Sequence, residues 1–254
     1  MGINLQKNFK LDLKANKPLI GTVISFNSTE VIELLSNCGF DWLWIDAEHG
    51  TYSTSDLQSM LQATNANVSC LIRVANSNIV EIKKALDLGP AGIIVPMVND
   101  KEQAEMVVQF AKYPTIGSRG VGLARAHGYG LKFDEYMKNA NTTTAIVIQI
   151  EHIEAVENIE SIMQVDDIDA IMLGPYDLSA SMGLMGEVDH PEVVKAIDHV
   201  IDIAKEADKA IGIFCGSNDA AKKYINKGCS LVAISTDSLM LGNVAVQAVE
   251  SFKK

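Results

Sequence analysis

The chain has 254 residues, of which 32 are acidic and 21 are basic, so its formal net charge is −11; 48% of the residues are hydrophobic. This is the composition of an ordinary globular protein, which excludes a disordered or fibrous chain. The acidic surplus excludes a general binder of nucleic acids or of anionic membranes, because such binding needs a basic face. The length fits one large domain, and single α/β barrels commonly have about 250 residues.

The cysteines and the absence of long apolar segments indicate the compartment. No two cysteines form a CxxC pair or a zinc-ribbon spacing, and a chain of this length needs no disulfide framework. No run of about 18 apolar residues is present, so we expect no membrane span. We therefore predict a cytoplasmic protein with reduced thiols at Cys38, Cys70, Cys215 and Cys229.

Eight short apolar runs recur along the chain and are separated by amphipathic segments typical of helices. Such continuous apolar runs are expected for strands that are buried on both faces of a parallel sheet. The predicted strands span residues 19–25, 41–46, 68–73, 91–96, 145–150, 169–174, 210–214 and 231–235.

The spacing of these runs predicts the fold class. In five of the seven intervals the strand starts are about 21–27 residues apart, which is one βα unit. Eight such units predict a single-domain TIM (β/α)8 barrel over residues 1–254. The competing fold, an open doubly wound sheet, lacks the GxGxxG motif after its first strand. Serine N-caps, among them Ser77, precede several of the helical segments.

A barrel places its chemistry at the carboxyl ends of the strands, so the residues that follow each run are the candidates for a site. Glu151 and Asp177 follow neighbouring strands, which lie about 4.8 Å apart in a sheet. Two carboxylates this close repel each other unless a cation or a shared proton lies between them, and oxygen ligands suit Mg²⁺ or Mn²⁺. The alternative is that each carboxylate caps a helix or pairs with a surface lysine.

Arg73 and His49 lie at the same predicted rim. Arg73 ends a buried strand, where it could bind an anion or form a salt bridge with Asp46 or Glu48. His49 could be a general base, a metal ligand or a polar rim residue. None of the strands ends in a lysine at this rim, which favours metal-assisted chemistry over imine chemistry.

Three further features have structural interpretations. The glycines of the segment Arg119-Gly120-Val121-Gly122 suit a rim loop, and a phosphate site is the weaker alternative. Trp42 and Trp44 alternate along the second strand and are expected to pack. Cys215 lies at the rim without a neighbouring histidine, so we expect a bystander rather than a nucleophile.

At these residues the sequence resembles the HpcH/HpaI aldolases, the metal-dependent class II pyruvate aldolases that act on 2-oxo-3-deoxy sugar acids and 4-hydroxy-2-oxo acids. The matching motifs cover almost the whole chain in order. They are WIDAEHG (44–50), LIR (71–73), LDLGPAGIIVPMV (86–98), SRGVG with ARA (118–126), VIQIE (147–151), IDAIMLGPYDLSASMG (168–183) and LVAISTD (231–237).

The resemblance implies a divalent metal ion (Mg, Mn or Co) held by Glu151 and Asp177. Pyruvate would chelate this ion through a carboxylate oxygen and its keto oxygen. Backbone N–H groups around Gly174 and Tyr176 would hold the carboxylate.

The resemblance also implies roles for four other residues. Arg73 would stabilise the enolate oxygen, and His49 would act as acid and base, polarised by Asp87. Gln149 matches a residue near the metal site. The implied reaction is reversible cleavage of a 4-hydroxy-2-oxo acid to pyruvate and an aldehyde through a metal-stabilised enolate.

Two alternative functions accompany this one. A related metal-enolate lyase would decarboxylate oxaloacetate or cleave a malyl or citramalyl thioester, and a non-catalytic barrel would use the rim for binding. The resemblance further implies a homo-oligomer, a hexamer built as a dimer of trimers. A C-terminal helix over about 238–253 would pack either on a neighbouring subunit or on its own barrel.

Overall fold

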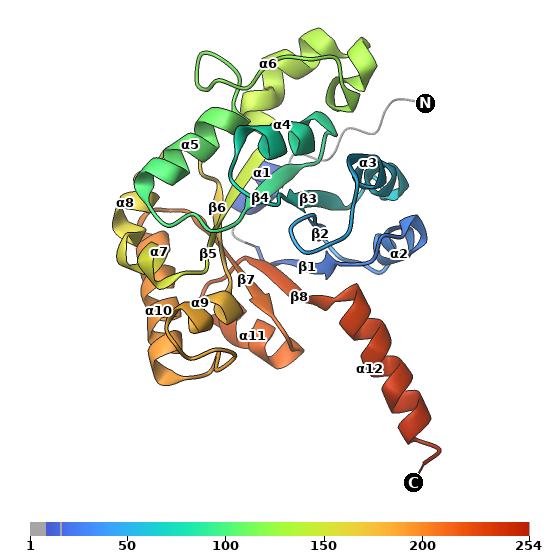
Figure 1. Ribbon diagram of the computed structural model, residues 1–254, viewed down its shortest axis with the longest axis vertical. Coiled ribbons are helices and arrows are strands. Elements are labelled where there is room, and N and C mark those ends of the chain that lie inside the picture. Colours follow the sequence, from blue (N-terminus) through green and yellow to red (C-terminus); the bar gives the residue numbers. More distant parts are fainter. Residues whose placement is uncertain (1–8, 16, 254) are drawn as a thin grey trace.

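The protein is a closed barrel of eight parallel strands, as the sequence predicts. The computed structural model describes residues 9–15 and 17–253. The strands pair in chain order and β8 closes the ring against β1 (Figure 1). Every strand begins and ends within one residue of its predicted run. The strands are β1 (Leu19–Ile24), β2 (Trp42–Asp46), β3 (Ser69–Arg73), β4 (Gly92–Val95), β5 (Ala145–Ile150), β6 (Ala170–Leu173), β7 (Ala210–Cys215) and β8 (Leu231–Thr236).

Helices connect the strands over the outside of the barrel. The α2 cap is Ser28, as predicted, but α4 is capped by Asn78 and not by Ser77. Asn78 has an extended backbone, and its side chain accepts hydrogen bonds from the backbone N–H groups of Val80 and Glu81. The helices are α1 (Phe9–Lys14), α2 (Thr29–Leu35), α3 (Thr54–Ala63), α4 (Ile79–Asp87), α5 (Lys101–Ala111), η1 (Arg125–Gly130), α6 (Phe133–Thr143), α7 (Ile153–Glu157), α8 (Ile159–Met163), α9 (Pro175–Ser181), α10 (Pro191–Glu206), α11 (Asn218–Asn226) and α12 (Asp237–Glu250).

Within the described residues, no helix has the length and apolar character that crossing a membrane requires.

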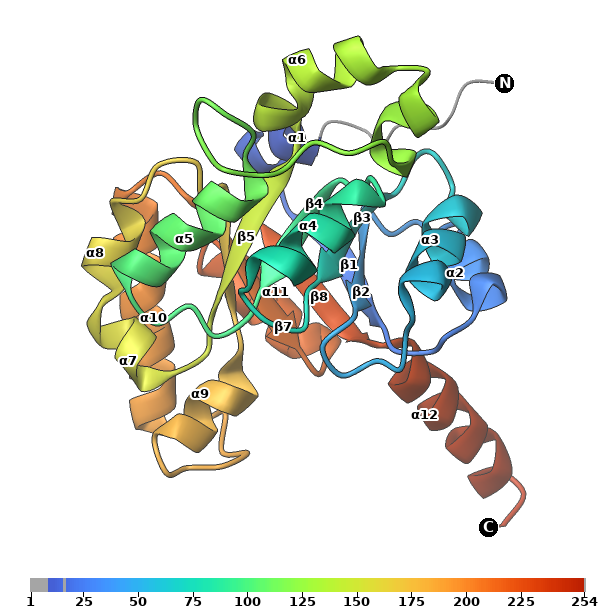
Figure 2. The ribbon, with the colours of Figure 1, turned by 45° about the horizontal axis from the view of Figure 1, so that its top comes forward.

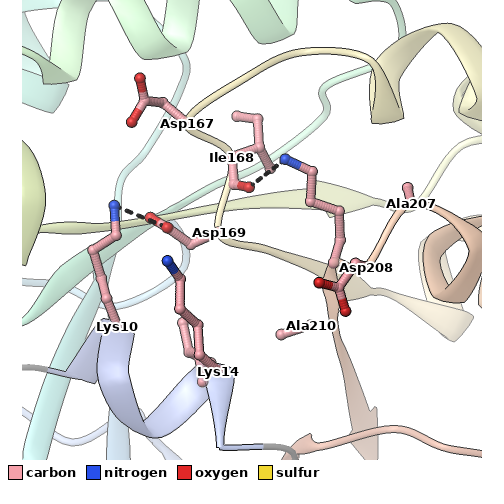
Figure 3. A pocket seen from close by; sticks show the side chains of 10 residues that line it. Lys10, Lys14, Asp167, Ile168, Asp169, Ala207, Asp208 and Ala210 are labelled. Atoms are coloured by element: carbon pink, nitrogen blue, oxygen red, sulfur yellow. Dashed lines mark hydrogen bonds and ion pairs between the residues drawn. The ribbon is translucent and has the colours of Figure 1, made fainter.

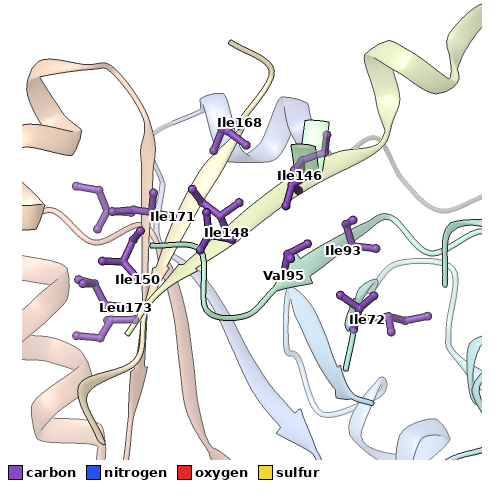
Figure 4. Packing of buried hydrophobic residues seen from close by; sticks show 14 of the residues in the cluster. Ile72, Ile93, Val95, Ile146, Ile148, Ile150, Ile168, Ile171 and Leu173 are labelled. Carbon is purple, nitrogen blue, oxygen red and sulfur yellow. The ribbon is translucent and has the colours of Figure 1, made fainter. Parts of the chain in front are cut away.

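Two apolar layers hold the barrel together. Alternate strand residues point outward and meet the helices, as Ile146, Ile148 and Ile150 of β5 do in Figure 4. The intervening residues point into the barrel and form a separate cluster that includes Trp42 and Trp44. This alternation follows from the two-residue period of a strand, and it also decides which polar residues reach the interior.

The amino ends of the strands enclose a cavity of about 460 Å³, larger than the one at the opposite end. Figure 3 shows two of the interactions that fix its lysine side chains. Lys10 of α1 lies 2.9 Å from the Asp169 carboxylate, and Lys209 donates to the Ile168 carbonyl at 2.9 Å. These contacts close the amino end of the barrel, whose residues contribute to stability rather than to catalysis in this fold.

The last helix does not pack on the barrel. α12 projects from the end of β8 away from the other helices, which Figures 1 and 2 both show. Asp237, at its first position, is its only buried residue among those described. Apolar side chains along it are more than half exposed, including Leu241 (63%), Val244 (65%) and Phe252 just beyond its end (90%). Folding back on its own barrel, one of the two predicted arrangements, is therefore not what the structure shows.

Candidate active site

The carboxyl ends of the strands surround a cavity of about 190 Å³. Although this cavity is the smaller of the two, its lining brings a guanidinium, an imidazole and carboxylates close together. Six of the residues that the sequence singles out line it together: His49, Arg73, Gln149, Gly174, Tyr176 and Asp177.

Arg73 is fixed at the mouth by two carboxylates. Its Nε and Nη2 each donate to Asp46 at 2.8 Å, and its Nη1 lies 3.1 Å from Glu48. Burial alone would lower the pKa of Arg73, but the hydrogen bonds and charge of Asp46, with the charge of Glu48, raise it above its usual value. The salt bridge considered from the sequence is thus formed, and it holds a permanent cation in the site. Nη1 also reaches Gln149 Oε1 at 3.5 Å.

Glu151 is buried behind this cation. It follows β5, is 2% exposed, and accepts the backbone N–H of Met97 at 2.9 Å and a short hydrogen bond from Gln149 Nε2. Burial raises the pKa of the Glu151 carboxyl to about 7; the Met97 N–H opposes this shift, and the negative charge of Asp177 adds to it. The two predicted metal ligands therefore lie within electrostatic range of each other.

Gly174 makes room for Glu151. It precedes α9, whose first turn carries Asp177. A Cβ atom at position 174 would lie 2.8 Å from the Glu151 Cβ and 2.9 Å from its Oε2, closer than real contacts allow. Only glycine fits here, which gives a steric reason for the Gly-Pro-Tyr-Asp sequence at this strand end.

His49 lies at the open side of the cavity. Its side chain is 71% exposed, and Nε2 is 3.7 Å from the Glu48 carboxylate. An exposed imidazole at the mouth is reachable by a bound substrate, as a general base must be.

Asp87 is not brought to this site. α4 runs from the carboxyl end of β3 toward the amino end of β4, so Asp87, its last residue, lies toward the opposite end of the barrel from His49. Its carboxylate lies 2.8 Å from Nη2 of Arg119, and it makes no contact with His49 within the described chain. The partnership with His49 thus stays a prediction, and one chain alone does not supply it.

The glycine-rich loop and Cys215 have structural roles. Arg119 is 2% exposed and lies over the Tyr113 ring at 4.5 Å, and Arg125 donates to the Leu88 carbonyl at 2.6 Å. Both arginines anchor the loop against the helices, which supports the interpretation as loop structure. Burial raises the pKa of the Cys215 thiol to about 12, so it is not a thiolate nucleophile.

Two groups at the site were not predicted as such from the sequence. Asp46 ends β2, and the sequence indicates it only as a salt-bridge partner; its place in register with Arg73 makes it the residue that orients the guanidinium. Met97 adopts a left-handed conformation (φ 54°) and presents its N–H to Glu151. No sequence signal marks Met97, because any residue can supply a backbone N–H.

A TIM barrel with carboxylates, an arginine and a histidine gathered at the carboxyl ends of its strands has the architecture of a barrel enzyme. Residues 20–243 match the HpcH/HpaI aldolase/citrate lyase family, and the chain belongs to that family.

Curated and solved relatives agree with this assignment. The chain is 38% identical over 244 residues to the 4-hydroxy-2-oxo-heptane-1,7-dioate aldolase of Shigella sonnei, covering 95% of this chain and 93% of that one. An HpcH/HpaI aldolase/citrate lyase family protein from Burkholderia cenocepacia superimposes with a TM-score of 0.94 at 32% identity, covering 97% and 99% of the two chains. The HpcH/HpaI aldolase of Desulfitobacterium hafniense gives 0.91 at 28% identity, covering 98% and 97%. The chain is therefore an aldolase of this family.

Proposed function

We propose that the chain cleaves a 4-hydroxy-2-oxo acid reversibly to pyruvate and an aldehyde, with a divalent metal ion held by Glu151 and Asp177. The observation that carries this proposal is the buried carboxylate of Glu151 beside Asp177, in a site whose fixed cation, Arg73, is already neutralised by Asp46 and Glu48.

The donor set fits such an ion. Glu151 and Asp177 offer oxygen ligands, which Mg²⁺ and Mn²⁺ prefer, and they leave coordination positions free for substrate and water. The raised pKa of Glu151 reflects negative charge in a buried place that a cation would compensate. The bound metal would act as a Lewis acid on the keto oxygen of the substrate.

The remaining steps fall to groups of the protein. His49 would take the proton of the C4 hydroxyl as the C3–C4 bond breaks, releasing the aldehyde and leaving the bond's electron pair in the pyruvate enolate. Arg73 would stabilise the enolate oxygen as this negative charge develops. Transfer of a proton to C3 of the enolate then yields pyruvate, so the proton taken from the C4 hydroxyl is accounted for.

Metal removal tests the proposal directly. Chelator-treated enzyme should lose both retro-aldol activity and the exchange of pyruvate methyl hydrogens with D₂O, and Mn²⁺, Mg²⁺ or Co²⁺ should restore both. Full activity in metal-free enzyme would refute it.

Substitutions of the ligands test the assignment of residues. Glu151→Gln or Asp177→Asn should lower turnover at least about 100-fold and weaken Mn²⁺ binding, because a charged ligand is lost. The matched control is Glu154→Gln on α7, an exposed carboxylate that follows Glu151 by three residues. Equal Mn²⁺ binding by all of these variants would contradict the assignment.

The first substrate to test is the one named for the relatives, 4-hydroxy-2-oxo-heptane-1,7-dioate. A coenzyme A thioester is a poorer candidate. His49 and Arg73 are the only basic side chains lining the described cavity, and Arg73 is engaged by carboxylates. Assays that follow pyruvate, aldehyde and CO₂ together separate aldol cleavage from decarboxylation of oxaloacetate.

We also propose that the enzyme is a homo-oligomer, a hexamer as the family resemblance implies. The exposed apolar side chains of α12 would be shielded from water if they packed against a second copy of the chain. The segment that carries Arg119, the ion-pair partner of Asp87, also exposes the apolar side chains of Ile116 (51%), Val121 (55%) and Leu123 (77%). Burying this segment against the barrel mouth of another copy would bring Asp87 of that copy toward His49.

Light scattering tests the assembly. A hexamer should have a mass of about 165 kDa, six times the chain mass of 27.5 kDa. Removal of α12 should yield an assembly of fewer than six chains. A monomer at all concentrations would refute the assembly. If mixing Asp87→Asn with His49→Asn protein restores some activity through hybrid hexamers, Asp87 acts between copies.

A further inference from the structure

The indole N–H of Trp44 is buried without an acceptor. Trp44 is 2% exposed, and its Nε1 has no hydrogen-bond partner in the described part of the chain. Trp42 provides the contrast: its ring stacks on that of Trp44 at 6.2 Å, and its Nε1 donates to the Leu19 carbonyl at 3.2 Å. Buried indole N–H groups almost always find a partner, because leaving one unpaired forfeits its hydration.

The residue that carries this buried donor lines the active-site cavity. Trp44 points into the barrel one layer below Asp46, on the same face of β2, and it lines the cavity at the mouth. The guanidinium carbon of Arg73 is 4.9 Å from the centre of its ring. Val23 and Phe214, which also line the cavity, carry no side-chain acceptor.

We propose that Trp44 Nε1–H donates a hydrogen bond to an oxygen of the bound 2-oxo acid and so helps to determine which acid the enzyme accepts. The inference rests on the function proposed above. An indole N–H is a donor only, so its ligand atom must be an acceptor. The acceptor is either an oxygen of the pyruvate core or an oxygen on a substituent at C3.

The protein provides its own internal reference for a test, because it has two tryptophans. In a ¹⁵N–¹H spectrum their two indole signals are assigned with Trp44→Phe. We expect the Trp44 proton to move downfield when pyruvate or 3-hydroxypyruvate is added to the Mg²⁺-loaded enzyme, while the Trp42 signal stays in place. A response to both acids indicates an oxygen of the core, and a response to 3-hydroxypyruvate alone indicates the substituent.

Calorimetry on the same samples separates failure of this inference from failure of the proposed function. If both acids bind and the Trp44 signal does not move, or if Mg²⁺ alone produces the whole shift, the inference is wrong and the proposed function stands. If neither acid binds the Mg²⁺-loaded enzyme, both are wrong.

Kinetics supply a second, independent measurement. Trp44→Phe keeps an aromatic ring and removes the donor, so it should raise the KM for the recognised acid about tenfold, the effect of one neutral hydrogen bond. The effect should fall on KM more than on kcat, measured by exchange of C3 hydrogens with D₂O. An unchanged KM for both acids would overturn the inference. If Trp44→Phe does not fold, Trp42→Phe assigns the two indole signals instead, and the spectrum of the unmodified enzyme decides the matter.

Discussion

Gly174→Ala is the smallest change that should disable the candidate metal site. The added methyl group would lie 2.8 Å from the Glu151 Cβ and 2.9 Å from its Oε2. Non-bonded carbon atoms pack at roughly 3.5–4.0 Å, so Glu151 must retreat by about 1 Å. Gly174 has a φ of −109°, which other residues adopt freely, so the effect comes from the collision and not from backbone strain.

The size of the effect follows from this displacement. Inserting a methyl group into a packed site costs about 1–3 kcal/mol. In a chain of this length such a cost lowers Tm by about 3–9 °C. A misplacement of about 1 Å at a reacting centre costs about 100-fold in rate, so turnover should fall far more than stability does.

The assay compares Mn²⁺ affinity, turnover and Tm in Gly174→Ala and in a matched control, Gly216→Ala. Gly216 follows β7 at the same rim, and a Cβ there meets no atom within 4 Å. The control should behave as the unmodified enzyme. If Gly174→Ala binds Mn²⁺ and turns over normally, Glu151 does not hold the metal in the position proposed here.

Three other predictions concern stability. Asp46→Ala leaves the buried Arg73 guanidinium without its bidentate partner and should lower the free energy of unfolding by about 3 kcal/mol in urea titrations; unchanged stability would show that the pair contributes nothing. Lys209→Met removes two hydrogen bonds to backbone carbonyls at the amino end and should cost about 1–2 kcal/mol with no loss of turnover; a loss of turnover at unchanged metal affinity would contradict a purely structural role. Burial raises the pKa values of three thiols to about 12, from a reference of 9.0, so between pH 9 and 12 the unfolded chain loses protons that the folded chain keeps. Stability should therefore fall as pH rises through this window, and the three thiols should contribute about 4 kcal/mol of this fall between pH 8 and 10 under reducing conditions. Replacing the buried Cys215 by alanine should remove about a third of the thiol contribution, whereas Cys38→Ala, at an exposed thiol, should leave it unchanged.

The sequence by itself determined the barrel and which residues gather at one of its rims. Buried parallel strands are continuous apolar runs, and their spacing of one βα unit leaves few alternatives to eight-fold closure. Because parallel strands end at one rim, the sequence alone places residues as distant as His49 and Asp177 at the same end of the barrel.

Only the tertiary structure decided which partners the side chains at this rim have. Whether Arg73 binds Asp46 depends on the register of β2 against β3. Whether the indole N–H of Trp44 is unpaired depends on whether a neighbouring residue places an acceptor within reach. The position of Asp87 depends on the direction of α4, and the exposure of α12 depends on whether any part of the same barrel can cover it. Register, packing and helix direction arise from contacts between distant segments, and a motif of a few adjacent residues contains no information about those contacts.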